Sequence, residues 1–277
     1  MINMKKVTHV AICYDFDGTL CIGNMQEYGF MQTLGIPPEK FWAKCSQQTK
    51  MYNMDKNLSY MKVMLDEAKK RNIVFRESDF MACGKDIALF NGVTGWFDRI
   101  NEYGKKKGVV VSHYLISSGL EEIVKGTPIY EKFARVFAGK YLYNGYGEAI
   151  WPARTVSYTE KTQYLFRINK GCLDYDDDVN EAMEEDERLI PFEQMIYFGD
   201  GDTDVACMSL LKSCGGYRVG VYQPHKSSSK KKAKELLTDG RVNIIAPANY
   251  APGSRIDRYV KTVIDKISAD KQLSCFN

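Results

Sequence analysis

Residues 10–20 read VAICYDFDGTL, and this stretch decides the fold. Its apolar first half belongs to a pattern over residues 7–14 that predicts a buried central strand. Two carboxylates, Asp15 and Asp17, follow that strand directly, and a glycine then turns the chain away. Two acids this close together are poorly suited to a hydrophobic core. They suit a divalent cation site, or a pair in which one carboxylate attacks and the other moves a proton; a polar turn after a strand is the remaining alternative.

The composition is that of an ordinary globular protein. Of the 277 residues, 44% are hydrophobic and 26% are charged, which suffices for one large domain or two modest ones. The net charge of +3 is small for this length, so we expect neither nucleic acid nor a membrane as a partner. The three histidines are too scattered for a histidine metal site.

Cysteine use and the start of the chain bear on the compartment. Eight cysteines are present and none forms a CxxC pair, which argues against a zinc knuckle. The apolar run that follows residues 1–6 is too short for a signal peptide, and no long apolar span occurs elsewhere. We therefore expect a cytoplasmic protein with reduced thiols.

Residues 21–91 differ in character from the strand before them. They are rich in Met, aromatic residues, Lys and Glu at helical spacing, and none of their segments is typical of a strand. The clearest helix covers residues 59–70, with Ser59 placed to cap its start, and another is predicted to begin at Pro37-Pro38. We interpret residues 21–91 as a helical insertion. Its aromatic residues are expected to form mostly its own core, with one or two facing the site: Phe41, Trp42, Tyr52 and Tyr60.

Strands and helices alternate through the rest of the chain. Strands are predicted over residues 109–116, 133–143, 148–156, 194–198, 217–222 and 242–246, the third pairing with the second across a glycine-containing turn. Helices are predicted over residues 96–103, 120–125, 159–168, 256–267 and through Leu211, with Gly104 ending the first. This alternation predicts an α/β fold with a Rossmann-like, doubly wound parallel sheet and helices on both faces.

Three of the predicted strands end in polar clusters. Besides the first pair of acids, these are Ser117-Ser118-Gly119 and the GDGDTD sequence of residues 199–204. Ligands of open parallel sheets bind outside the carboxyl ends of the strands, so the clusters are expected to converge. Hydroxyls, carboxylates and a cation together suit a phosphate ester. The Ser117 hydroxyl and the amides of Ser118 and Gly119, opening a helix, would hold the phosphate oxygens.

These motifs resemble those of a known superfamily. Residues 15–19, DFDGT, are similar to the DxDGT motif of the haloacid dehalogenase superfamily, and residues 116–119, ISSG, resemble its second motif. Lys161 at a helix start resembles the third motif, and residues 199–204 resemble the fourth, GDGxxD. The four occur in the order of the superfamily, with compatible spacing.

The resemblance implies a division into two domains. It covers residues 7–20 and about 93–265, so the α/β core would comprise residues 1–20 and 92–277. The insertion at residues 21–91 is placed like the helical cap that this superfamily carries after its first motif. Within the superfamily the layout is most similar to the phosphoserine phosphatase-like hydrolases.

The resemblance also implies catalytic roles. Asp15 would be the nucleophile that forms an aspartyl-phosphate, and Asp17 would protonate the leaving oxygen and then activate water. Ser117 and Lys161 would hold the phosphoryl oxygens, and Lys161 would also restrain the charge of Asp15. The acid at position 17 favours a phosphatase or phosphotransferase, because the P-type ATPases of the superfamily carry Thr there and its dehalogenases lack that acid.

Mg²⁺ is the cofactor that the resemblance implies. It would be bound by the Asp15 side chain, the Asp17 backbone carbonyl and Asp200, with Asp204 close by through water or Lys161. The expected function is Mg²⁺-dependent hydrolysis of a phosphate monoester of a small metabolite, which would be the partner. A phosphotransferase or phosphomutase with the same intermediate is the first alternative, and a non-catalytic binding protein that keeps the fold is the second.

Four positions have a second interpretation. Ser117 could simply cap the next helix, and Ser118 could have no role in binding. Lys161 could be an exposed helix lysine, since Lys140 and Lys170 flank the same region. Asp202 is expected to face solvent or to cap a helix. The basic run at residues 226–234 is interpreted as an exposed loop and helix start. The substrate, the cap residues that contact it, the oligomeric state and the role of residues 171–193 stay open.

Overall fold

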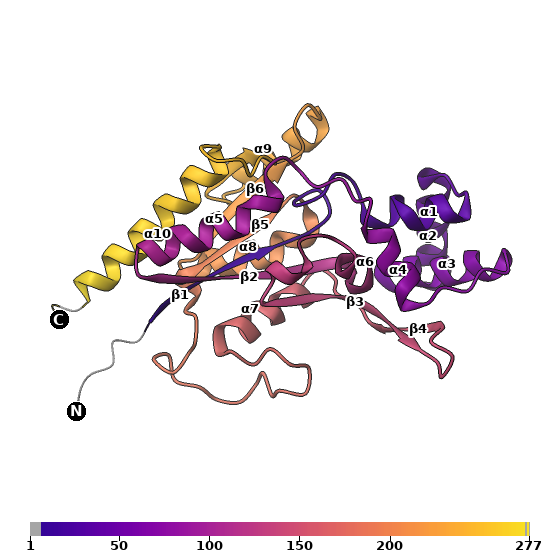
Figure 1. The fold of residues 1–277 in the computed structure, drawn as a ribbon, viewed down its shortest axis with the longest axis horizontal. Coiled ribbons are helices and arrows are strands. Elements are labelled where there is room, and N and C mark those ends of the chain that lie inside the picture. Colours follow the sequence, from indigo (N-terminus) through magenta and orange to yellow (C-terminus); the bar gives the residue numbers. More distant parts are fainter. Residues whose placement is uncertain (1–6, 275, 277) are drawn as a thin grey trace.

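The structure is a computed structural model that describes residues 7–274 and residue 276. The predicted absence of a signal peptide and the outer limits of the predicted core therefore fall partly outside the described residues. Within them seven strands form one sheet in the order β4-β3-β2-β1-β5-β6-β7 (Figure 1). The strands are β1 Thr8–Tyr14, β2 Val109–Leu120, β3 Arg135–Tyr143, β4 Ala149–Arg154, β5 Met195–Gly199, β6 Tyr217–Tyr222 and β7 Ile244–Pro247.

All neighbouring strands are parallel except β4, which pairs antiparallel with β3 at one edge of the sheet. The α/β prediction is therefore confirmed, and the predicted hairpin makes the sheet a mixed one. At the centre, Tyr14 of β1 is in register with Leu115 of β2 and Phe198 of β5. This register brings the segments that follow β1 and β5 to the same edge of the sheet.

Alternating residues of β1 separate the core into two layers, because successive side chains of a strand point to opposite faces. Val10 and Ile12 pack in the layer that contains residues of α5 Val93–Lys106 and α10 Arg255–Leu273. Ala11 and Cys13 pack with residues of the other three long helices of the core. These helices are α7 Glu160–Lys170, α8 Val205–Ser213 and α9 Ser227–Thr238. The predicted coverage of both faces is confirmed.

The segment between β1 and α5 is helical and lies at one end of the sheet (Figure 1). Its elements are η1 Met25–Glu27, α1 Gly29–Leu34, α2 Pro38–Tyr52, α3 Lys56–Lys70 and α4 Glu77–Gly84. Phe30 packs against Phe41, Phe75 and Phe80, which form an aromatic core for these helices. The exact limits of a separate cap domain stay a prediction. Tyr52, expected in that core, is 64% exposed.

Two predicted helix ends are wrong. Helix α3 begins at Lys56, because the Asp55 carboxylate accepts hydrogen bonds from the amides of Asn57 and Leu58. Ser59 is instead buried inside the helix and donates to the carbonyl of Cys45. Helix α5 continues through Gly104 to Lys106. A Cβ at position 104 would lie 2.5 Å from Cγ2 of Val111, so this glycine permits close packing on β2.

The remaining elements are short. Strand β2 continues to Leu120, so α6 comprises only Glu121–Lys125, and the 3-10 helices are η2 Tyr130–Lys132, η3 Phe192–Gln194 and η4 Asp202–Asp204. Residues 171–191 form turns, held to α7 by a hydrogen bond from Arg167 to the carbonyl of Asp174. Among the residues described, no helix combines the length and the apolar composition needed to cross a membrane.

Candidate active site

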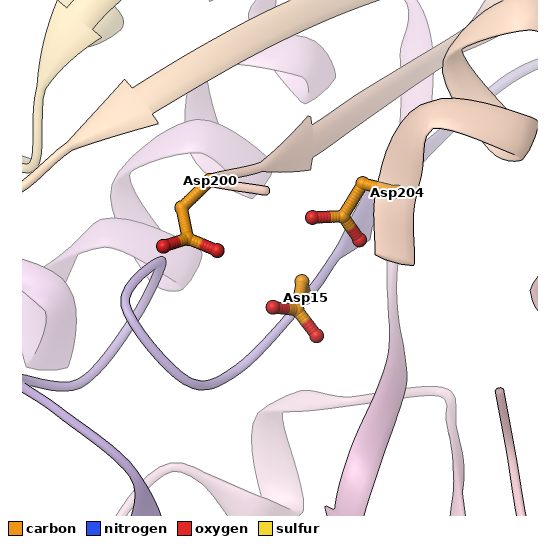
Figure 2. Close-up of side chains that lie close together, drawn as sticks. All are labelled: Asp15, Asp200 and Asp204. Atoms are coloured by element: carbon orange, nitrogen blue, oxygen red, sulfur yellow. The ribbon is translucent and has the colours of Figure 1, made fainter. Parts of the chain in front are cut away.

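Three carboxylates gather at the carboxyl edge of the sheet (Figure 2). Asp15 follows β1, Asp200 follows β5, and Asp204 ends η4. One carboxylate oxygen of each lies within 4.8 Å of those of the other two. The Asp15 amide also donates to the carbonyl of Phe198 at 2.9 Å, which fixes the two strand ends together. Three like charges this close require compensation by a cation or by protons.

Lys161 supplies part of that compensation. Its Nζ donates to Oδ1 of Asp15 and to Oδ1 of Asp204, both at 2.8 Å, and the lysine side chain is fully buried. Burial alone would lower the pKa of Lys161, but the charges of the two carboxylates outweigh it and hold that pKa above its ordinary value. The ammonium has three N–H donors, of which two are used.

The Asp204 carboxylate is surrounded by donors. Besides Lys161, the Tyr197 hydroxyl donates to Oδ1 at 2.8 Å, and the Gly201 amide donates to Oδ2 at 3.2 Å. Tyr197 lies on β5, so the strand itself positions Asp204. In this arrangement Asp204 holds Lys161 in place, and its oxygens are less available to a cation than those of Asp200.

Asp200 is the carboxylate that lacks such donors. No hydrogen bond to its side-chain oxygens is made by the part of the chain that the structure describes. Burial, and then the charges of Asp15 and Asp204, raise its pKa to about 7. Gly18 lies against it at φ 73°, and a Cβ there would lie 2.5 Å from Oδ2 of Asp200. The turn after β1 therefore requires glycine twice over, for its conformation and for the space that Asp200 occupies.

Asp17 faces the helical segment. Its Oδ1 accepts a hydrogen bond from the Met25 amide at 2.8 Å and one from the Cys21 thiol at 3.5 Å. Burial, followed by the charge of Asp15, raises the pKa of Asp17 to about 8, although both hydrogen bonds oppose the shift. Burial likewise raises the pKa of Asp15 to about 6, against the effect of Lys161. Asp17 thus holds a proton more readily than Asp15.

The second polar cluster lies between β2 and the helical segment. The fully buried Ser117 accepts a hydrogen bond at Oγ from the Gly119 amide at 3.0 Å. Ser118 Oγ is buried without a hydrogen-bond partner, and its carbonyl accepts from the Tyr60 hydroxyl of α3. Helix α6 begins at Glu121 with Leu120 as the residue before it, so its predicted start is confirmed to within one residue, but Ser118 and Gly119 lie on β2 and do not open the helix. The role of this cluster in phosphate binding stays a prediction.

Comparisons with known proteins bear on the fold. No protein-family model matches the chain. An uncharacterized protein of Borreliella burgdorferi is 27% identical over 286 aligned positions, covering 91% of this chain and 95% of that protein. A HAD family hydrolase of Salmonella enterica superposes with a TM-score of 0.60 at 14% identity, covering 92% of this chain and 71% of the other.

Two phosphoserine phosphatase structures are also similar. A probable phosphoserine phosphatase of Vibrio cholerae has a TM-score of 0.58 at 10% identity, covering 98% of this chain and 68% of the other. A phosphoserine phosphatase with a phospho-aspartyl intermediate analogue has a TM-score of 0.53 at 16% identity, covering 92% of this chain and 99% of the other. The chain has a haloacid dehalogenase-like fold.

In this haloacid dehalogenase-like fold, a cavity of about 500 Å³ opens above the carboxylates. It is lined by Asp15, Asp17, Gly18, Gly23, Asn24, Ser118, Tyr158, Asp200, Gly201, Asp202, Thr203, Gln223, Lys226, Ser228, Ser229 and Lys232. The structure thus brings Asp15, Asp17, Asp200 and Ser118 to one space. Lys161, Ser117 and Asp204 are fully buried and are not among the lining residues.

Sequence reasoning missed two parts of this cavity. Tyr158, whose hydroxyl accepts a hydrogen bond from Lys56 of α3 at 3.1 Å, lies in a loop without a motif. The residues around the start of α9 belong to the basic run for which the sequence predicts an exposed loop and helix start. The helix is there, but two lysines of the run, Lys226 and Lys232, line the cavity. The sequence did contain one signal for this. The run follows β6, and ligands of parallel sheets bind beyond the carboxyl ends of the strands.

Proposed function

We propose that the protein is a Mg²⁺-dependent phosphatase that hydrolyses the phosphate monoester of a small metabolite through an aspartyl-phosphate on Asp15. The observation that carries the proposal is the convergence of Asp15, Asp17 and Asp200 on one cavity, with Lys161 bonded to Asp15 from behind. The cavity volume of about 500 Å³ supports a small substrate. The fold shared with phosphoserine phosphatases supports the reaction class.

The residues present fit a magnesium ion. All candidate ligands are oxygens, as Mg²⁺ prefers, and the half-buried Asp200 carboxylate has no donor from the described residues. Asp15, Asp200 and the backbone carbonyl of Asp17 would hold the ion, with Asp204 close by. When bound there, the ion would offset the negative charge of the phosphate.

The side chains divide the two chemical steps. Lys161 binds Oδ1 of Asp15, so Oδ2 is the oxygen that attacks phosphorus. The ester P–O bond breaks, and the leaving alkoxide takes the proton that Asp17 carries because of its raised pKa. Asp17, now ionised, takes a proton from water as the water oxygen attacks phosphorus, and the bond between phosphorus and Oδ2 of Asp15 breaks. Inorganic phosphate leaves, Asp15 is regenerated and Asp17 is protonated again.

Three groups would hold the phosphoryl oxygens. Lys161 has one N–H that neither aspartate uses. Ser117 accepts from the Gly119 amide, which leaves its own O–H free to donate. Ser118 Oγ, buried and unpartnered at the cavity wall, gains a partner when an anion binds.

The seven described cysteines are free thiols, which supports the cytoplasmic location expected from the sequence.

A panel of phosphate monoesters, assayed for released inorganic phosphate with Mg²⁺ or with EDTA, tests this function. We expect Mg²⁺-dependent release without any added acceptor. Consumption of the ester only when an alcohol acceptor is supplied, with the phosphoryl group recovered on that alcohol, would replace the hydrolase by a phosphotransferase. Magnesium binding without turnover of any ester would replace the enzyme by a binding protein.

A further inference from the structure

The cavity above the carboxylates has a second wall that is basic. Lys226 and Lys232 line it together with the aspartates. The Lys232 ammonium lies over Gly201 and pairs with Asp202 at 3.2 Å, whereas no acidic side chain among residues 7–274 pairs with Lys226. The proposed chemistry at Asp15 already has its own buried cation, Lys161, so it does not require these two lysines.

The start of α9 adds positive charge to the same wall. Ser228 and Ser229, in its first turn, also line the cavity, and their amides have no acceptor in the described part of the chain. Lys226 is the residue before the helix. No side chain caps the helix, and its first turn contains no acidic residue. The lysines therefore add positive charge to the positive end of the helix dipole and to amides without acceptors, which is unfavourable.

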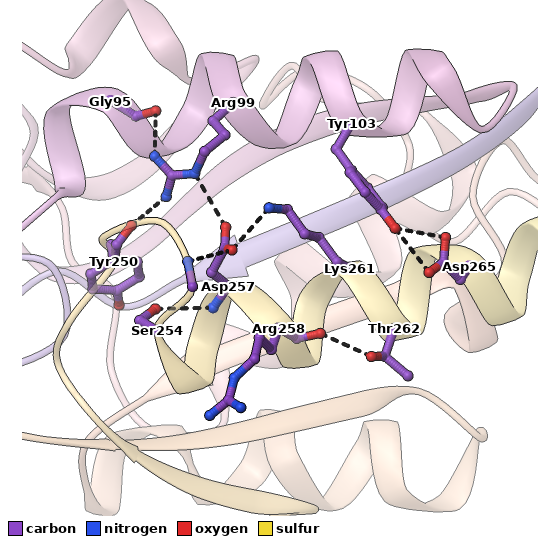
Figure 3. A network of polar contacts seen from close by, with 11 residues as sticks. Gly95, Arg99, Tyr103, Tyr250, Ser254, Asp257, Arg258, Lys261, Thr262 and Asp265 are labelled. Atoms are coloured by element: carbon purple, nitrogen blue, oxygen red, sulfur yellow. Dashed lines mark hydrogen bonds and ion pairs between the residues drawn. The ribbon is translucent and has the colours of Figure 1, made fainter.

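Another helix of the protein shows the usual solution. At the start of α10, Ser254 Oγ accepts a hydrogen bond from the Asp257 amide at 3.1 Å, and the Asp257 carboxylate adds negative charge to the first turn (Figure 3). Several other helices also lack a side-chain cap, but at α9 a lysine stands directly before the helix, no acid follows in the first turn, and this start lies beside the candidate site. Departures of this kind are expected where a ligand supplies the missing interaction.

Ser118 provides an independent sign of a polar ligand in this cavity. Its Oγ is buried without a partner and lines the same space as Lys226. A ligand that reaches both the carboxylate end and the basic wall needs an anion at each end. The first would be the phosphate transferred to Asp15, and the second would meet the α9 wall.

We infer that Lys226, Lys232 and the amides of Ser228 and Ser229 form a subsite for a second anionic group of the substrate, a carboxylate or phosphate on the leaving group. The inference rests on the proposed function for its first anion. The subsite determines specificity and orientation: the leaving group is drawn toward α9, which places the ester phosphate at the carboxylate end. Lys226 is exposed and Lys232 is half-buried, so the attraction is moderate and sensitive to salt.

Three alkyl phosphates of equal chain length, ending in a hydroxyl, a carboxylate or a second phosphate, test the subsite. We expect kcat/KM to be about tenfold higher for the carboxylate ester or the second-phosphate ester than for the hydroxyl ester, mainly because KM is lower. Lys226→Met should remove most of that preference, by raising KM for the ester with the second anion more than KM for the hydroxyl ester. Lys231→Met, on the face of α9 away from the cavity, should leave the preference intact. The carboxylate and phosphate esters show which anion is preferred.

Binding measurements test the subsite even if no ester is hydrolysed. An alkane diphosphonate and the matching hydroxyalkyl phosphonate, titrated into the protein by calorimetry, should differ in affinity, and Lys226→Met should abolish the difference. Equal binding of the two probes, or equal loss for both in Lys226→Met, would overturn the subsite while leaving the proposed function untouched. Tighter diphosphonate binding without hydrolysis of any ester would support the subsite and reject the phosphatase.

Discussion

Lys161 and Asp204 form a fully buried ion pair, with Nζ 2.8 Å from Oδ1 and neither side chain exposed to solvent. The same ammonium contacts Asp15 at the same distance. Because Tyr197 and the Gly201 amide hold Asp204, the position of the proposed nucleophile is set from β5 through Asp204 and Lys161. Breaking this chain of contacts should therefore affect both stability and activity.

Asp204→Asn should lower the free energy of unfolding by about 3 kcal/mol, because Lys161 loses one of two buried counter-charges. Turnover should fall as well, since Lys161 is then less well positioned against Asp15. Urea unfolding measures the first effect, and Asp98→Asn on the exposed side of α5 is the control. If the effects of Asp204→Asn and Lys161→Met simply added in the double variant, the two side chains would not act as a coupled pair.

Asp15→Asn should lower kcat by at least about 10⁴-fold, because the amide cannot attack phosphorus. The amide oxygen can still accept from Lys161, so the variant should stay folded, although Lys161 loses one of its two counter-charges as it does in Asp204→Asn. Released phosphate and far-UV circular dichroism are the measurements. Retained turnover in a folded Asp15→Asn variant would remove Asp15 as the nucleophile.

Asp17→Asn should slow hydrolysis of alkyl phosphates by about 10²- to 10⁴-fold and that of nitrophenyl phosphate less, because a good leaving group needs little proton transfer. The Met25 amide can still bond to the amide oxygen, so the loop should keep its place. Pre-steady-state kinetics separates the first step from hydrolysis of the intermediate. Identical losses for both ester classes would contradict the role of Asp17 as general acid.

His113 should make the protein less stable in acid. Its Nδ1 lies 2.9 Å from the Tyr14 hydroxyl and its Nε2 2.9 Å from Oδ1 of Asn101, and burial lowers its pKa from 6.5 to about 3. Between these values the unfolded chain binds a proton that the folded protein refuses. Stability from this group is therefore present above about pH 6.5 and falls by about 1.4 kcal/mol per pH unit below it.

The comparison with His113→Gln isolates this effect. The raised pKa values of Asp15, Asp17 and Asp200 act in the opposite sense, since the folded protein binds their protons more readily. The difference in unfolding free energy between the two proteins removes that contribution. It should shrink steadily as the pH falls from 6 to 4. A constant difference over this range would mean that His113 is protonated in the folded protein.

The order of elements could be predicted because it depends on local patterns. The strand before Asp15 and the strand before Asp200 are short apolar runs that end in acids, and both lie at the predicted positions. The ends of helices were less predictable. Asp55 and Ser59 both suit a cap, and the choice depends on the carbonyl of Cys45, which lies across from Ser59 on a different helix.

Local sequence was enough to establish the α/β alternation, the helical segment after the first strand and the acids available at the strand ends, because periodicity and residue type are local properties. The packed fold was needed to show that Lys161 contacts Asp15 and Asp204, whereas Lys170 donates to the carbonyl of Val179. It was also needed to show that the start of α9 lines the cavity. The partner of a lysine depends on distances between segments remote in sequence, and those distances arise only when the sheet and its helices pack.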